Sequence, residues 1–276
     1  MARIACPQQT LPPFSPLRDW SINALLSTLQ SNYKKKSKAT VALTLQEAKK
    51  MLHAFPHTVR GRFHELCIAF PLLGMLRQRA AKSLIIFYEI RGNQIHTLPE
   101  SDVQIHVDAR GKRFLRIRVD SDKNLKLGRE RFGYVPEYIA TLDYSLLRRL
   151  EEYLLIAQPP SGSFLLCAPK ADKPAPKFFS NAFTGFARIW RDTFKRLFPS
   201  EHDRLVASHS GRKTLAEALW NDGWCRRVIA DAGGWFLKRD AVDLYFQTDP
   251  TTILYALEHL GERLGLSRLG APPQAV

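Results

Sequence analysis

The sequence has few cysteines, and their spacing does not suggest a bridge or a metal site. Four cysteines are spread over 276 residues, and no two have the C-x-x-C spacing of a zinc or redox motif. They are Cys6, Cys67, Cys167 and Cys225. The spacing therefore suggests no disulfide framework, and we expect reduced, mostly buried thiols in an intracellular protein.

The sequence also gives no support for a metal centre or for a nucleotide-driven mechanism. His53 and His57 are four residues apart, but Pro56 interrupts a continuous helix and no third ligand stands at ligand spacing. The phosphate-binding patterns G-x-x-x-x-G-K-[ST] and G-x-G-x-x-G are absent. We therefore expect no metal and no cofactor.

Long apolar runs are missing as well. The most apolar stretch, residues 66–76, is shorter than the roughly 20 residues needed to cross a bilayer, and it ends at Arg77. The N-terminus lacks the basic and apolar regions of a signal peptide. We expect no membrane partner and an intracellular location.

Acidic residues are scarce relative to basic ones. The chain has 41 Lys and Arg against 26 Asp and Glu, a formal net charge of +15. This excess favours a polyanionic partner, either nucleic acid or an anionic membrane face. The basic run at residues 34–38 is a solvated linker by default, and beside a basic domain it can also track phosphates.

Hydrophobic patterning predicts a mainly α-helical fold with a small three-stranded antiparallel sheet. Alternating apolar residues on both sides of a glycine-containing turn predict a hairpin, followed by a third strand. The expected strands span residues 103–107, 115–119 and 132–135, with a separate short strand at 164–167. Expected helices span residues 21–33, 60–73, 78–84, 142–155, 178–198, 209–222 and 251–264, and another begins at Thr44 with a capping box.

The most informative stretch begins at His209. Ser208 is predicted to cap a helix over residues 209–222, with Gly223 as its stop. His209 and Arg212 then lie one turn apart at the positive end of that helix, which suits an anion. The H-x-x-R pattern alone is weak, because residues 57–60 also match it, a match that we interpret as incidental.

Two further groups follow the histidine and arginine. Trp235 comes after two glycines, and its indole N–H can donate to a phosphoryl oxygen, although a tryptophan is more often a core residue. Tyr245 is by default a half-buried helix tyrosine. A phenol has a pKa of about 10, so it becomes a nucleophile only beside cations or a base. Neighbouring Arg, His and Lys side chains would supply these cations and the base, and their charges would stabilise a pentacoordinate phosphorane.

In their order along the chain, these residues resemble the tyrosine recombinases, the phage-integrase family. The resemblance covers residues 42–264 and is most specific in HSGRKTLAEALWNDG, VIADAGGW and DLYF. It implies the tyrosine-recombinase catalytic-domain fold. The residues that carry it are Arg77, Lys123, His209, Arg212, Trp235 and Tyr245.

The resemblance implies a role for each basic group. Arg77 and Arg212 clamp the scissile phosphate of double-stranded DNA. Lys123, in the turn after the second strand, protonates the leaving 5′ oxygen, and Lys126 is the alternative in the same turn. His209 assists proton transfer.

The resemblance also assigns the remaining residues. Trp235 occupies the place where many members have a second histidine, and Tyr245 forms a 3′-phosphotyrosine, so neither ATP nor metal is required. The helix over residues 251–264 would dock on a neighbouring protomer in a homotetramer on DNA. Tyr255 is an alternative nucleophile, since the spacing from Trp235 to Tyr245 is one residue longer than usual.

Two departures keep other functions open. Ala80 stands where the family often has an acid, and only about forty residues precede the catalytic part. We predict a core-binding-domain remnant at residues 1–40 and a catalytic domain at 41–276. The preferred function is site-specific DNA recombination or integration in a mobile element, located on DNA in the nucleoid, cytoplasm or nucleus. The alternatives are a truncated or domesticated DNA-binding protein without cleavage, and a type IB topoisomerase-like enzyme.

Overall fold

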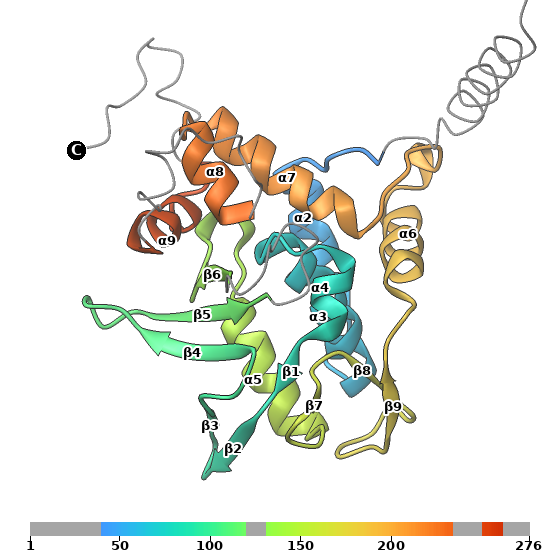
Figure 1. The fold of residues 1–276 in the computed structure, drawn as a ribbon. Helices are drawn as coiled ribbons and strands as arrows, with labels where there is room; N and C mark the ends of the chain where they lie inside the picture. The colour runs from blue at the N-terminus through green and yellow to red at the C-terminus, as the bar shows by residue number, and fades with distance from the viewer. Residues whose placement is uncertain (1–39, 120–130, 234–249, 262–276) are drawn as a thin grey trace, which may run out of the picture. The chain divides into compact units, whose positions relative to one another are not determined.

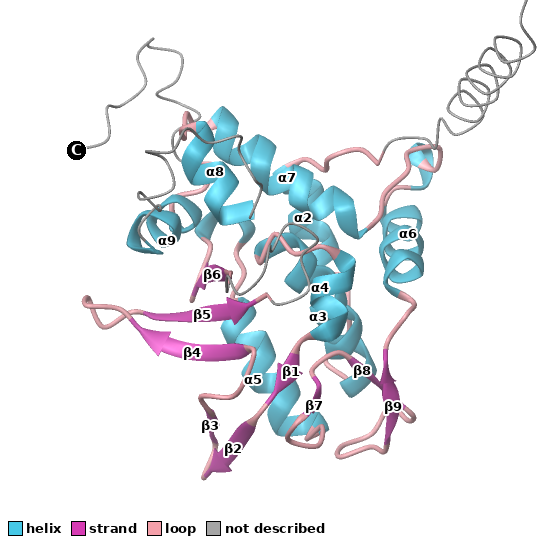
Figure 2. Cartoon of the chain, in the orientation of Figure 1, coloured by secondary structure: helices cyan, strands magenta, loops and turns pink. Residues whose placement is uncertain are grey.

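Helices are the main regular structure of the described residues, with small antiparallel sheets beside them (Figures 1 and 2). The computed structural model describes residues 40–119, 131–233 and 250–261. No helix within these ranges is both long and apolar enough to cross a membrane. The helices are α2 (Leu45–Leu52), α3 (Val59–Leu73), α4 (Gln78–Ser83), α5 (Leu146–Ala157), α6 (Phe186–Leu197), α7 (Ser208–Asn221), α8 (Arg226–Gly233) and α9 (Pro250–Glu258), with 3-10 turns η1 (Ala140–Leu142) and η2 (Pro199–Glu201).

The predicted hairpin and third strand are present as a three-stranded sheet in the order β4-β5-β6. Ile105 pairs with Leu115, and Ile117 pairs with Gly133, all antiparallel. The sequence did not predict three further two-stranded pairings: β1 with β7, β2 with β3, and β8 with β9. The strands are β1 (Ile85–Ile86), β2 (Tyr88–Arg91), β3 (Gln94–Thr97), β4 (Val103–Val107), β5 (Arg113–Arg118), β6 (Phe132–Pro136), β7 (Ser163–Phe164), β8 (Cys167–Pro169) and β9 (Phe178–Ala182).

Several predicted boundaries are wrong. The single helix expected over residues 178–198 begins instead with β9, which pairs with β8, and only then continues as α6. The short strand expected at 164–167 is divided between β7 and β8. Helix α5 starts four residues later than expected, because the Ser145 side chain caps it by accepting from the Arg148 N–H at 3.1 Å. Helix α9 ends at Glu258, before Gly261 at φ 83°.

The helix start predicted at Thr44 is confirmed. The Thr44 hydroxyl accepts from the Glu47 N–H at 3.1 Å, and the Glu47 carboxylate accepts from the Thr44 N–H at 2.8 Å. This reciprocal pair is a capping box, which satisfies two N–H groups that the first turn leaves without helical partners. It fixes the start of the described chain beside α7, where Leu43 N–H donates to the Thr214 hydroxyl.

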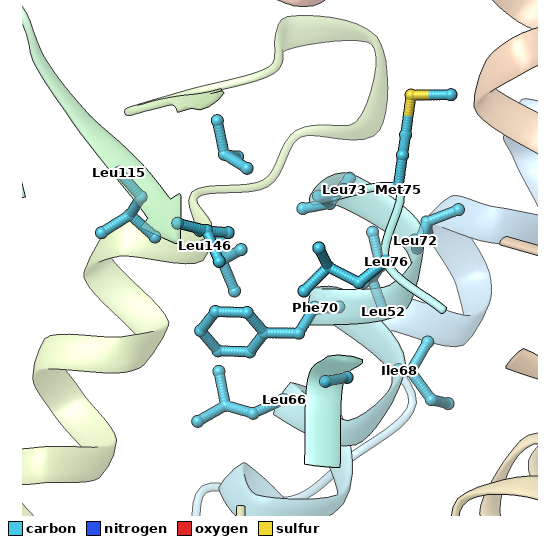
Figure 3. Close-up of a cluster of buried hydrophobic side chains, with 14 of the residues drawn as sticks. Leu52, Leu66, Ile68, Phe70, Leu72, Leu73, Met75, Leu76, Leu115 and Leu146 are labelled. Carbon is cyan, nitrogen blue, oxygen red and sulfur yellow. The ribbon is translucent and has the colours of Figure 1, made fainter. Parts of the chain in front are cut away.

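Helix α3 is the centre of the hydrophobic core. Almost all of its residues are buried, and it packs against α5, α6 and α7. Figure 3 shows Leu115 of β5 and Leu146 of α5 facing Phe70 of α3. Two predicted buried thiols, Cys67 and Cys167, do lie inside the protein, whereas Cys225 is exposed.

Gly211 lets α7 approach the backbone of α3. A Cβ atom at this position would lie 2.9 Å from the Leu72 Cα atom and 2.9 Å from Cη2 of Trp190. Neither helix can shift freely, since both are buried on these faces. The second residue of the S-G-R triplet therefore has a packing role that the sequence alone does not reveal.

We expect Gly211→Ala to destabilise the protein by about 1–3 kcal/mol through overpacking, despite the higher helix propensity of alanine. Glu217→Ala, at an exposed position of the same helix, should change stability by less than about 0.5 kcal/mol. Urea unfolding followed by circular dichroism measures both values. An unchanged midpoint for Gly211→Ala would contradict the close approach of the two helices.

Candidate anion-binding site

The first turn of α7 contains the H-S-G-R motif, but its cap differs from the prediction by one residue. Ala207 occupies the cap position and Ser208 is the first helical residue. The reason lies in two hydrogen bonds. The Ser210 hydroxyl accepts from the Ala207 N–H at 3.2 Å, and the Ser208 hydroxyl instead donates to the Gln78 side chain at 3.5 Å. The helix ends at Asn221, and Gly223 at φ 82° provides the predicted stop.

Arg77 lies where α3 leads into α4. It is the residue immediately before α4, in extended conformation and half-buried. Its neighbour Gln78 accepts the hydrogen bond from Ser208. The junction that carries Arg77 is therefore tied to the first residue of α7.

His209 is the exposed member of the motif. Partial burial lowers the pKa of its imidazole, and the positive charges of Arg212, Lys213 and Arg77 lower it further. Arg77 comes from a different element, in which its neighbour Gln78 is hydrogen-bonded to Ser208, the residue before His209. The structure thus ties the junction that carries Arg77 to the helix turn that carries His209 and Arg212.

Arg212 points into the protein rather than to the surface. Its side chain is 0% exposed, and Nη2 donates to the Gly233 carbonyl at 2.5 Å. Gly233 is the last residue of α8, which packs beside α7 (Figure 1). The described chain stops there, directly before Gly234 and Trp235. Arg212 therefore fixes the starting point of the segment that leads toward Tyr245.

Arg131 is a residue at this site that the sequence did not single out. It stands at the base of the connection between β5 and β6, where its carbonyl accepts from the Val119 N–H at 2.8 Å. Its Nη2 lies 3.4 Å from the Ala232 carbonyl, one residue before the carbonyl that Arg212 contacts. The β5–β6 connection and α7 thus meet at the same end of α8. Nothing local distinguishes Arg131 from the other arginines near it.

Three predicted residues and one alternative lie outside the described part of the chain. Lys123 and its alternative Lys126 belong to residues 120–130, and Trp235 and Tyr245 belong to residues 234–249. The segments that contain them are joined to the site at their described ends, Arg131 and Gly233.

The alternative nucleophile Tyr255 lies at the other end of α7. Its ring stacks on His259 and makes an edge contact with Trp224, with 6.2 Å between centroids. Trp224 follows the C-terminal end of α7, and about 1.5 Å of rise per residue places that end about 18 Å from His209. This position does not favour Tyr255 as a group that acts with His209.

Ala80 is buried within α4, three residues after Arg77. Ala80 stands where the tyrosine recombinases often have an acidic residue, so this position carries a buried methyl group and no carboxylate.

These groups are of the kinds that bind a tetrahedral anion. His209 and Arg212 belong to the N-terminal turn of α7, which carries partial positive charge, and the junction that carries Arg77 is hydrogen-bonded to the same turn. Arginine is the side chain best suited to bidentate contacts with phosphate oxygens. The lowered pKa leaves His209 neutral near pH 7 before an anion binds, so it can accept a proton.

We expect Arg77→Gln to raise the pKa of His209 toward its ordinary value, because one repelling charge is removed. Histidine-selective NMR titration of the DNA-free protein measures this shift. Arg79→Gln, at an exposed neighbouring position, is the control and should leave the titration unchanged. Equal curves for native protein and Arg77→Gln would show that Arg77 is not close to His209.

Comparison with known proteins found similarity only among solved structures. No protein-family profile matches the sequence, and no curated protein matches it. One similar structure is the XerH site-specific recombinase bound to a palindromic difH substrate in a post-cleavage complex, at 12% identity and a TM-score of 0.44, covering 85% of this chain and 55% of that one. Another is XerH bound to difH in a pre-cleavage complex, at 12% identity and a TM-score of 0.44, covering 84% and 54%. The chain spans about half the length of these structures.

Proposed function

We propose that this protein cuts and rejoins double-stranded DNA through a tyrosine-linked intermediate, as a site-specific recombinase or integrase of a mobile element. The observation that carries the proposal is that the junction with Arg77 is hydrogen-bonded, through Gln78 and Ser208, to the turn of α7 that contains His209 and Arg212. The net charge of +15 supports a polyanionic substrate. We further propose that the protein acts as a homotetramer on DNA, inside the cell.

In the proposed reaction, Arg77 and Arg212 hold the non-bridging oxygens of the scissile phosphate. The Tyr245 oxygen attacks phosphorus, and the bond from phosphorus to the 5′ oxygen breaks. The phenolic proton passes to neutral His209 or to water, and Lys123 gives a proton to the leaving 5′ oxygen. The Trp235 indole N–H donates to a phosphoryl oxygen. Since one phosphate ester replaces another, rejoining needs no external energy source.

Two features of the described chain support Tyr245 as the nucleophile. The segment that contains it begins at Gly233, whose carbonyl accepts from Arg212. Tyr255, by contrast, contacts Trp224 beyond the far end of α7. The segment that contains Tyr245 therefore begins beside the end of α7 to which we assign phosphate binding.

We expect Tyr245→Phe to abolish covalent DNA capture and to leave DNA binding intact. The test is a nicked duplex that traps the covalent complex, resolved on a denaturing gel, with native-gel binding measured in parallel. Tyr255→Phe is the matched control and should retain the covalent band. If Tyr245→Phe still captures DNA and Tyr255→Phe does not, the nucleophile is wrongly assigned.

The same assay, together with a plasmid-relaxation assay, separates the other functions. Ala80, buried at the position of a family acid, favours a DNA-binding protein without cleavage as the second candidate. That protein would shift duplex DNA on a native gel and form no covalent band. Relaxation of supercoiled plasmid without recombinant product would instead favour a topoisomerase-like activity.

A further inference from the structure

The outer face of the β4-β5-β6 sheet carries cations and aromatic rings. Along β5, Leu115 and Ile117 are fully buried, and Leu115 faces α3 and α5 (Figure 3). Because side chains alternate along a strand, Arg116 and Arg118 lie on the opposite face. Arg116 is flanked by Gln104 of β4 and Tyr134 of β6 in the antiparallel register.

A small pocket opens on this face next to Arg116. Its volume is about 170 Å³, well below the roughly 300–1,000 Å³ of sites for drug-sized ligands. Most of the residues that line it are polar or charged. The lining residues are Pro99, Asp102, Gln104, Arg116, Arg118 and Phe132.

The two arginines of the pocket differ in their partners. Arg118 lies 2.9 Å from the Asp102 carboxylate, and its backbone N–H also donates to the Asp102 carbonyl at 2.7 Å. The guanidinium carbon of Arg116 lies 3.6 Å from the centre of the Phe132 ring. Within the described residues Arg116 has no carboxylate partner, so the pocket keeps one positive charge in excess.

The ring contact determines how Arg116 can bind a ligand. Phe132 covers one flat face of the guanidinium, which leaves the N–H groups at its edge for acceptors in the pocket. Gln104 lines the same place; its Nε2 donates one N–H to the Pro99 carbonyl at 2.5 Å and has a second N–H for a ligand. An edge of parallel N–H donors with one net positive charge matches a phosphate group.

The pocket is also close to the anion-binding site. Arg118 pairs with Phe132, and the next residues of the two strands, Val119 and Arg131, are joined by a hydrogen bond. Arg131 reaches Ala232, beside the Gly233 carbonyl that Arg212 contacts. A duplex held at the start of α7 would therefore extend near this pocket.

We propose that the pocket formed by Gln104, Arg116 and Phe132 binds a backbone phosphate of DNA, separate from the scissile phosphate. The identity of the ligand as DNA rests on the proposed function. The contact is not to the edge of a base, so it adds affinity and fixes the register of the duplex without reading sequence.

The test is the salt dependence of DNA binding, measured by fluorescence anisotropy with a duplex of fixed length. Arg116→Gln should weaken binding alike on unrelated sequences and reduce the slope of log K against log salt by about 0.9, the value for one lost phosphate contact. Phe132→Leu keeps the charge and should weaken binding while preserving the slope. Arg148→Gln, at a 74% exposed side chain on α5, is the matched control and should change neither quantity beyond error.

The outcomes separate this inference from the proposed function. An equal slope for Arg116→Gln and Arg148→Gln would overturn the phosphate pocket, even if Tyr245-dependent covalent capture is observed. A reduced slope for Arg116→Gln would support the pocket, even if no covalent band forms and the cleavage function fails. Absence of DNA binding by the native protein would overturn both. Thermal melts of each variant confirm that the compared proteins are folded.

Discussion

Replacing Arg212 by lysine is expected to reduce covalent DNA capture about 100- to 1,000-fold, the usual effect of losing one preorganised donor to a transition-state oxyanion. The Arg212 side chain is fully buried and already bonded through Nη2 to the Gly233 carbonyl. A guanidinium has five N–H donors in a planar fork, so it can contact more than one acceptor at a time. Lysine keeps the charge but offers a single ammonium, which cannot serve both partners in this geometry.

Single-turnover trapping on a nicked duplex measures the effect, and non-covalent binding is followed in the same preparations. Arg191→Lys is the control, since its side chain is 53% exposed on α6 and the change should be silent. We expect Arg212→Lys to retain most of its DNA affinity, because the charge remains. Capture within threefold of the native rate would show that Arg212 does not contact the reacting phosphate.

Elements whose determinants are close in sequence were predictable. The capping box at Thr44 and Glu47 needs only four consecutive residues, and the structure contains both of its hydrogen bonds. The β4–β5 hairpin needs only period-two alternation around a turn, and its register follows from that turn. In both cases the local pattern and the final fold favour the same conformation.

Elements that depend on distant partners were not predictable. Strand β9 was assigned to the helix that follows it, because its strand conformation is satisfied by pairing with β8, which local patterning does not show. The cap of α7 was placed at Ser208, yet that hydroxyl contacts Gln78, 130 residues away in sequence. Gly211 likewise needs the backbone of α3 to explain it.

The candidate site follows the same division. Residue types and their order indicated Arg77, His209 and Arg212, but only the fold shows that the residue after Arg77 is hydrogen-bonded to the residue before His209. The burial of Arg212 against Gly233 and the contact between Arg131 and Ala232 depend on how α8 packs. The kind of ligand can be inferred from the residue types, whereas the position of each residue depends on tertiary contacts.

The second large effect is expected for a buried ionic network between α3 and α5. Arg62 and Glu65 are each at most 3% exposed, and they form an ion pair of 2.5 Å. Arg62 also lies 2.9 Å from Glu152, and Arg149 lies 3.2 Å from Glu65. Two guanidinium groups thus share two carboxylates beside the core. His57, from the H-x-x-R match that we interpret as incidental, contacts Arg62.

Glu65→Gln should therefore destabilise the protein by about 3–5 kcal/mol, because two guanidinium groups beside the core are then left with one carboxylate, that of Glu152. Urea unfolding at pH 7 measures the loss. Glu89→Gln, which removes an exposed partner of Arg91, should cost less than about 1 kcal/mol. Arg62→Met combined with Glu65→Leu should recover much of the stability, since the pair is removed together with its desolvation cost.

Acid should weaken the same network. Burial alone would raise the pKa of Glu152, but the charges of Arg149 and Arg62 lower it below its ordinary value. A carboxylate with a lowered folded-state pKa stabilises the protein above its unfolded-state pKa, and this contribution is lost as the pH falls through the folded-state value. The difference in the free energy of unfolding between native protein and Glu152→Gln should therefore become smaller from pH 7 toward pH 3. A difference that stays constant over that range would show that the ion pairs of Glu152 do not stabilise the fold, and that α3 and α5 are joined by their apolar contacts.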